Sequence, residues 1–177
     1  SINQQPIEIV ERKGLSHPDT IADGIAESIS IEYSKYCLEN FGAVLHHNVD
    51  KTIILGGQCD IEYGRGALLK PFRVLFGGRM SRSFGDQAID GDAIQTNATK
   101  DYLQKILPRL NVAKDLEFHT FTSSSSRIPH WFSPRTTDDL PEHKNPHAND
   151  TATVIGFWPL STVEQIVLAG ERFFYEY

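Results

Sequence analysis

The start of the chain's longest apolar repeat carries residues suited to phosphate and magnesium chemistry. His17, Pro18 and Asp19 stand where the pattern predicts that a helix begins. Free backbone N–H groups at the amino end of a helix attract phosphate oxygens. In that setting Asp19 could hold Mg²⁺, and His17 could hydrogen-bond the phosphate that the metal bridges. The alternative is an ordinary capped helix whose first-turn acids are favoured by the helix dipole.

Two histidines and a pair of opposite charges precede a predicted strand. His46 and His47 are adjacent, so their side chains point to opposite faces of an extended chain and do not easily share one metal. No third His or Cys stands at zinc-ligand spacing, which argues against zinc. Asp50 and Lys51, at the strand entrance, either face a charged ligand or form the commoner surface ion pair.

A long polar segment covers residues 123–149 and contains four consecutive serines. It has no GxSxG element, so a polar loop is a better interpretation than a serine hydrolase. Asn149, Asp150 and Thr151 stand at the exit of this segment, where a predicted strand begins. There an Asp or Asn could contact the polar edge of a ligand, although both residues are also common in turns.

The glycines exclude two familiar nucleotide sites. Gly56-Gly57, Gly64, Gly66 and Gly77-Gly78 form neither a GxxxxGK[ST] loop nor a GxGxxG turn between a strand and a helix. A Walker-type NTPase and a Rossmann dinucleotide site are therefore not supported. We interpret these glycines as turn and bulge positions.

Periodicity predicts the elements that position these residues. Apolar residues four apart indicate a helix over 17–41, with Ser16 as a suitable cap and Gly42 after its end. A capping box at Ser161–Glu164 predicts a last helix that buries one apolar face, formed by Val163, Ile166, Val167, Phe173 and Phe174. The remaining predicted elements are strands at 7–11, 51–59, 72–76, 117–122 and 151–158, and a helix at 93–107.

This order of elements predicts an α+β fold. Short links between neighbouring strands favour an antiparallel or mixed sheet, with the helices on one face. The chain has 177 residues, 40% of them hydrophobic, which is enough to form a folded core.

Composition and charge exclude several classes of protein. The formal net charge of -6 makes a broad nucleic-acid binder improbable. No apolar run reaches the length of a membrane span, so no membrane association is expected. Two cysteines without a secretion signal indicate a reducing compartment, and we predict a cytoplasmic protein.

Four separated motifs together resemble the archaeal-type methionine adenosyltransferases, or S-adenosylmethionine synthetases. The motifs occur in the family's order, and the resemblance runs from about Ile7 to the end of the chain, although only over the front part of the family's length. They are Glu11–Asp19 followed by Asp23–Glu27, His46–Lys51 with the glycine pair at 56–57, Ala148–Thr151, and Pro159–Ser161 with a Glu-containing helix after it.

The resemblance implies an enzyme that joins ATP and methionine and hydrolyses the released triphosphate, with Mg²⁺ and K⁺ as cofactors. It implies that His17 and Asp19 are catalytic and that Asp19 binds the metal. The implied substrate-binding residues are Pro18, Asp50, Lys51, Asn149, Asp150 and Thr151.

The resemblance also implies the organisation of the molecule. Residues 1–150 would be the amino-terminal α+β domain of a synthetase-like fold, and residues 151–177 would begin or bridge to a second similar domain. The expected partner is a second copy in a homo-oligomer, such as a dimer, or a complementary synthetase chain.

Some positions depart from the family pattern and keep two alternatives open. Ser16 replaces a glycine, Met80-Ser81 replaces Ala-Thr, and residues 123–131 contain no Gly-Gln-Gly-Ser-like segment. One alternative is a diverged, non-catalytic paralogue that binds ATP or S-adenosylmethionine or regulates a true synthetase. The other is a small Mg²⁺-dependent phosphohydrolase that uses Asp19.

Overall fold

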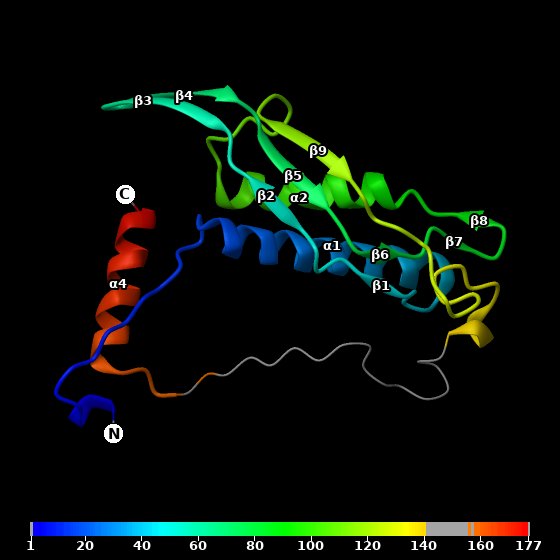
Figure 1. The fold of residues 1–177 in the computed structure, drawn as a ribbon, viewed down its shortest axis with the longest axis horizontal. Coiled ribbons are helices and arrows are strands. Elements are labelled where there is room, and N and C mark those ends of the chain that lie inside the picture. The colour runs from blue at the N-terminus through cyan, green and yellow to red at the C-terminus, as the bar shows by residue number, and fades with distance from the viewer. Residues whose placement is uncertain (1, 141–155, 157, 177) are drawn as a thin grey trace. The chain divides into compact units, whose positions relative to one another are not determined.

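The structure is a computed structural model that describes residues 2–140, 156 and 158–176. The chain divides into two compact units. One is Ser16–His147, and the other joins Ser1–Leu15 to Ala148–Tyr177. The larger unit contains a three-stranded sheet with helices α1 and α2 on one face (Figure 1), which confirms the α+β fold. The division of the chain at residue 150 stays a prediction.

Helix α1 (Pro18–Phe41) confirms the first predicted helix almost residue for residue. One residue in four along it faces the core, and Gly42 ends it in the left-handed conformation with φ 71°. A glycine adopts this conformation without steric cost, which is why the helix stops there. The core residues of α1 are Ile21, Ile25, Ile29, Tyr33 and Cys37.

The central sheet is mixed. Its order is β2 (Ile53–Leu55), β5 (Phe72–Phe76) and β9 (Leu116–Thr120). Strand β5 runs antiparallel to β2 and parallel to β9. The parallel pair needs a long crossover, and helix α2 supplies it.

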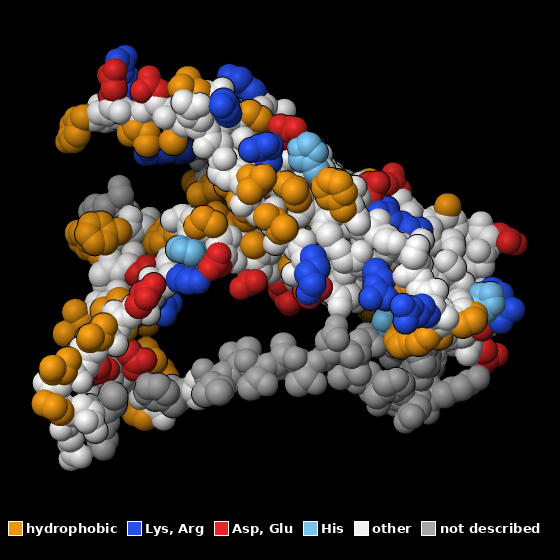
Figure 2. Space-filling view, in the orientation of Figure 1, with side chains coloured by type: hydrophobic (Ala, Val, Ile, Leu, Met, Phe, Trp, Pro, Cys, Tyr) orange, Lys and Arg blue, Asp and Glu red, His pale blue; other side chains and the backbone are white. Residues whose placement is uncertain are grey.

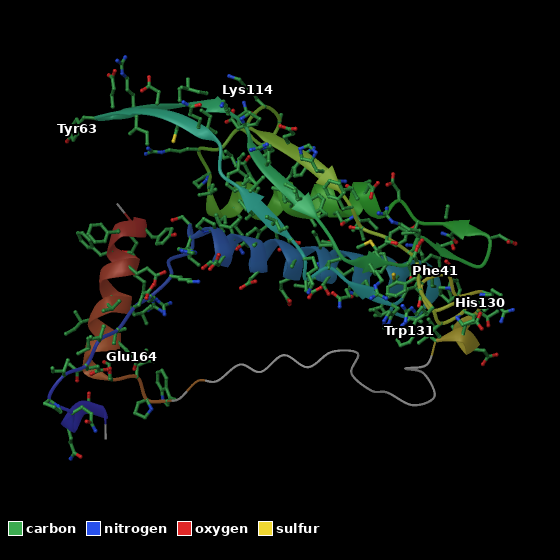
Figure 3. All side chains as sticks on the ribbon, in the orientation of Figure 1. Phe41, Tyr63, Lys114, His130, Trp131 and Glu164 are labelled. Atoms are coloured by element: carbon green, nitrogen blue, oxygen red, sulfur yellow. The ribbon has the colours of Figure 1, made fainter. Side chains whose placement is uncertain are left out.

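The predicted strand over 51–59 is divided in two. After β2 the chain leaves the sheet at Gly56-Gly57 and enters a separate hairpin, β3 (Gln58–Glu62) with β4 (Arg65–Lys70). A Cβ on Gly57 would lie 2.1 Å from the Lys70 carbonyl oxygen, so only glycine allows this close approach. Tyr63 lies at the tip of the hairpin (Figure 3), and every residue of both strands is exposed.

Helix α2 (Gly91–Ile106) packs on α1 and completes the core. Gly24 of α1 makes room for Tyr102 of α2, because a Cβ at Gly24 would overlap the tyrosine hydroxyl. The predicted helix began two residues too late, since Asp90 caps the amino end through a bond from the Ala93 N–H. Within the described ranges, no helix combines the length and the apolar character needed to cross a bilayer.

Two short antiparallel ladders lie outside the central sheet. Strand β1 (His47–Asn48) pairs with β6 (Arg79–Met80), and β7 (Ser83–Phe84) pairs with β8 (Gln87–Ala88). A single bridge extends the first ladder from Arg79 to Ser123. Two short 3₁₀ turns, η1 (Ile2–Gln4) and η2 (Thr137–Asp139), complete the described elements.

The smaller unit corrects two predictions. Residues 7–11 form no strand, and Ile7 and Ile9 are 76% and 91% exposed. Alternation alone does not make a strand when no neighbouring backbone pairs with it. Helix α4 (Thr162–Glu176) forms as predicted, but none of its residues is buried, and Phe174 is 81% exposed. An amphipathic pattern predicts a helix face, not the surface that covers it.

The capping box of α4 is confirmed and predicts a measurable stability change. The Glu164 N–H donates to Ser161 Oγ at 3.1 Å, and the Ser161 N–H donates to Glu164 Oε2 at 2.7 Å. Replacing Ser161 with Ala should lower the stability of α4 by about 1 kcal/mol, measured by amide hydrogen exchange along the helix. Thr162→Ala is the matched control, since this exposed neighbour does not cap the helix; equal exchange in the two variants would contradict the prediction.

Candidate functional site

His17 caps helix α1, which corrects the expectation that Ser16 would. The backbone of His17 is extended (φ -65°, ψ 137°), and its carbonyl accepts the first helical bond, from the Ile21 N–H at 2.9 Å. Its ring atom Nδ1 accepts from the Asp19 N–H at 3.1 Å. Pro18 occupies the first helical position, where its missing N–H costs nothing.

This cap fixes the chemistry of the His17 ring. Because Nδ1 accepts a backbone N–H, the neutral ring carries its proton on Nε2. The Nε2–H is therefore the group that the ring can donate to a phosphate oxygen. The His17 side chain is 40% exposed, so a ligand in solution can reach it.

Asp19 lies in the first turn of α1, with Oδ2 4.0 Å from His17 Nδ1. Its side chain is 62% exposed, and Asp23 and Glu27 continue on the exposed face of the helix. The described residues contain no group of three His, Cys, Asp or Glu side chains that could enclose a metal. One exposed carboxylate nevertheless suits Mg²⁺, which takes one or two carboxylates and fills its other positions with phosphates and water. The structure thus brings His17 and Asp19 together at one helix end.

Asp50 and Lys51 form a second local group after β1. Their side chains make an ion pair with each other, and both are more than half exposed. The backbone of this run is fixed, because the Gly77 N–H donates to the Lys51 carbonyl at 3.1 Å. This geometry matches the surface ion pair that the sequence allowed, and a role in substrate binding stays a prediction.

His46 and His47 have separate environments, as their adjacency predicted. His47 packs against Tyr33, its Nδ1–H donates to the Leu45 carbonyl at 2.9 Å, and its Nε2 accepts from Ser30 Oγ at 2.8 Å. The His46 ring instead lies 4.8 Å from the ring of Trp131. The two rings therefore contact different parts of the unit, and His47 ties β1 to α1.

The buried position of His47 predicts a pH effect on stability. Burial lowers the pKa of the His47 imidazole below its ordinary value of about 6.5. Below that pH the unfolded chain binds a proton at His47 that the folded chain does not, so the free energy of unfolding should fall as the pH decreases. In His47→Gln we expect the free energy of unfolding, measured with urea, to depend less steeply on pH than in the unchanged protein. The difference should be seen from about pH 6.5, the ordinary pKa of an imidazole, down to about pH 5. The same slope in both proteins would refute this role.

The predicted substrate-binding residues at 149–151 lie outside the described residues. Asn149, Asp150 and Thr151, and most of the predicted strand at 151–158, fall in that part of the chain. Their roles therefore stay predictions.

The structure adds a polar group that sequence reasoning missed. Gln95 of α2 is fully buried, and its Oε1 accepts from Thr122 Oγ1 at 2.8 Å, directly before the four serines. The position of Gln95 on the face of α2 that also buries Ala98 and Leu103 was the available signal, because a buried amide needs hydrogen-bond partners.

Comparison with known proteins connects these features to one family. Residues 1–177 match the family described as S-adenosylmethionine synthetase (AdoMet synthetase). The chain is 41% identical over 180 residues to an S-adenosylmethionine synthase of Thermoplasma volcanium, with 97% of this chain and 42% of that protein covered. It is 40% identical over 167 residues to an S-adenosylmethionine synthase of Methanoregula boonei, covering 94% of this chain and 40% of that protein.

A further relative carries no assigned activity. An uncharacterized protein of Streptococcus pyogenes serotype M3 is 48% identical over 170 residues, which cover 96% of this chain and 43% of that protein. The chain therefore spans about two fifths of the length of the curated relatives it matches.

Proposed function

We propose that this chain, which belongs to the S-adenosylmethionine synthetase family, forms the amino-terminal part of an enzyme that makes S-adenosylmethionine from ATP and methionine. In this reaction the methionine sulfur attacks C5′ of ATP. The bond from C5′ to the triphosphate oxygen breaks, the triphosphate leaves, and water then hydrolyses it to pyrophosphate and phosphate. Negative charge builds up on the leaving triphosphate, so hydrogen-bond donors and cations belong there.

The cap of α1 is the observation that carries the proposal. His17 Nε2–H would donate to the triphosphate beside the bond that breaks, while the amino end of α1 adds favourable electrostatic potential. Asp19 would contribute one oxygen to Mg²⁺, which when bound neutralises phosphate charge. This division of roles suits an exposed carboxylate beside an imidazole donor.

We also propose further substrate contacts, a second cation and an assembly, each implied by the family resemblance. Asp50 and Lys51 would contact substrate, and Asn149, Asp150 and Thr151 would form a wall near the adenosine or methionine. K⁺ would assist as a monovalent cation. We also propose a cytoplasmic homo-oligomer or an assembly with a complementary synthetase chain, with residues 151–177 leading into a second domain.

The test uses the protein at its natural length, incubated with ATP, methionine, Mg²⁺ and K⁺, with the products separated by chromatography. We expect S-adenosylmethionine together with pyrophosphate and phosphate. Phosphate without S-adenosylmethionine would replace the proposal by the phosphohydrolase alternative, and binding of ATP without any product would replace it by the non-catalytic paralogue.

One observation favours the paralogue as the second candidate. The identity to the uncharacterized streptococcal protein, 48%, exceeds the 40% and 41% identities to the two archaeal synthases. A branch of the family that changed its role would give this pattern. Assaying the streptococcal protein in the same way distinguishes the two candidates, because a synthase should form S-adenosylmethionine there too.

A further inference from the structure

Helix α1 carries a glycine in its interior, at a position where helices usually avoid one. Gly24 belongs to the regular part of the helix, which runs from Pro18 to Phe41, so the backbone conformation itself does not require a glycine there. A glycine inside a helix is less stable than an alanine, because it loses more conformational freedom on folding. The reason for Gly24 therefore lies in the side chain that packs against it.

Tyr102 of helix α2 occupies the space that a side chain at Gly24 would need. A Cβ on Gly24 would lie 2.0 Å from Tyr102 Oη and 2.2 Å from Tyr102 Cζ. The three atoms nearest to this Cβ all belong to the same tyrosine ring, and each distance is shorter than any real Cβ contact. The ring of Tyr102 thus lies directly against the backbone of α1.

Buried neighbours hold this contact on both helices. On α1, Ile21 and Ile25 lie on either side of Gly24 and are only 3% and 0% exposed. On α2, Tyr102 packs against the hydrophobic core, and the next residue, Leu103, is fully buried. Because protein cores are close-packed, neither helix can shift here without disturbing its neighbours.

The contact lies close to the cap of α1. Gly24 follows His17 by seven residues, which is about 10 Å along a helix. The first turn itself faces solvent, since Pro18 and Asp19 are exposed, and Figure 2 shows acidic side chains along the exposed face of α1. A helix bends little over this length. The place of the cap therefore follows from the buried contacts at Ile21 and Gly24.

We propose that Tyr102 is a positioning residue for the proposed reaction. Its ring, packed on Gly24, sets the distance between α1 and α2 at this end of the helix pair and thereby the place of His17 and Asp19. This inference rests on the proposed function for the roles of those two residues, and Tyr102 acts through α1 without contacting substrate. Precise placement matters, because moving a catalytic group by about 1 Å can lower the rate about 100-fold.

The test combines substitutions on the two helices in the protein at its natural length. Gly24→Ala adds the Cβ that overlaps the tyrosine ring, so α1 has to move away from α2. Tyr102→Leu removes the ring, and the double variant places the added Cβ beside the smaller leucine. Tyr102→Phe is the conservative variant, since it keeps the ring.

The expected results separate kcat from KM. In Gly24→Ala the kcat for S-adenosylmethionine formation should fall by about tenfold or more, while the KM for methionine, which His17 is not proposed to contact, stays nearly unchanged. Tyr102→Phe should remain close to the unchanged protein, and Tyr102→Leu should fall several-fold. The double variant should return to the kcat of Tyr102→Leu, because the overlap is gone.

Thermal unfolding gives a change of sign. Gly24→Ala should lower the Tm when Tyr102 is present. In the Tyr102→Leu background the same substitution should raise the Tm, because alanine is then simply the better helix former. The same loss of kcat from Gly24→Ala in both backgrounds would overturn the proposal, and so would a normal kcat in Gly24→Ala with a lowered Tm.

A further readout does not depend on synthesis. Inorganic triphosphate with Mg²⁺ should shift the NMR signals of the His17 ring in the unchanged protein, at a several-fold higher concentration in Gly24→Ala. Signals that do not move in the unchanged protein would overturn the inference. If Gly24→Ala does not fold, equal kcat values in Tyr102→Leu and Tyr102→Phe would overturn it instead. A protein that forms no S-adenosylmethionine but shows this Gly24-dependent binding would refute the proposed function and leave the positioning role standing.

Discussion

Replacing His17 with Asn is expected to reduce S-adenosylmethionine formation by about 100-fold or more while leaving the fold intact. Asparagine is a good cap, so its side-chain oxygen can accept the Asp19 N–H in place of Nδ1. It cannot reproduce the Nε2–H that the imidazole would donate to the triphosphate. Loss of one such donor lowers kcat by about 10²–10³-fold in well-studied sites. The measurement is steady-state formation of S-adenosylmethionine together with a thermal unfolding curve.

Two further variants show whether this loss is chemical or structural. His17→Ala removes both the cap and the donor, so it should lose the same activity and also about 1 kcal/mol of stability. His119→Asn is the matched control, because His119 pairs with Glu117 on β9 and has no proposed role. Asp19→Asn should lose activity as well, with partial recovery at high Mg²⁺ concentration. Normal turnover in His17→Asn would refute the role assigned to His17.

Replacing Gly78 with Ala is expected to destabilise the larger unit by about 3 kcal/mol or more, from backbone strain and overpacking together. Gly78 has φ 111°, a conformation that residues with a side chain rarely adopt. A Cβ there would lie 2.1 Å from the Asn48 carbonyl oxygen, which is backbone and cannot rotate away. The β1–β6 ladder would have to separate, and the Asp50–Lys51 run would move with it. Urea unfolding gives the change in the free energy of unfolding.

Gly66→Ala provides the matched control for this prediction. Gly66 lies in the exposed strand β4, where a Cβ would meet its nearest neighbour, the Asp60 carbonyl oxygen, at an ordinary 3.5 Å. The change there should stay within about 0.5 kcal/mol, as for most surface substitutions. A similar loss in both variants would show that the close approach at Gly78 does not determine stability.

Local sequence determined the elements whose signals lie within a few residues of one another. Helix α1 follows from apolar residues four apart and the glycine that ends it, and α4 begins at a capping box whose two bonds are both present. Strand β5 matches its predicted bounds, because β-branched and aromatic residues end there at a glycine pair. The S-adenosylmethionine synthetase family was also predicted correctly from the sequence, because the motifs occur in the family's order.

Only the tertiary structure decided features that depend on contacts between distant residues. The choice of His17 over Ser16 as the cap depends on backbone dihedral angles, and the division of residues 51–59 depends on the approach of Lys70 to Gly57. Periodicity could not show that Gln95 meets Thr122, because the partners lie 27 residues apart. The same reason explains why residues 7–11 were mistaken for a strand. A strand and a buried polar side chain both require partners that local sequence does not specify, and those partners are brought together only when the chain folds.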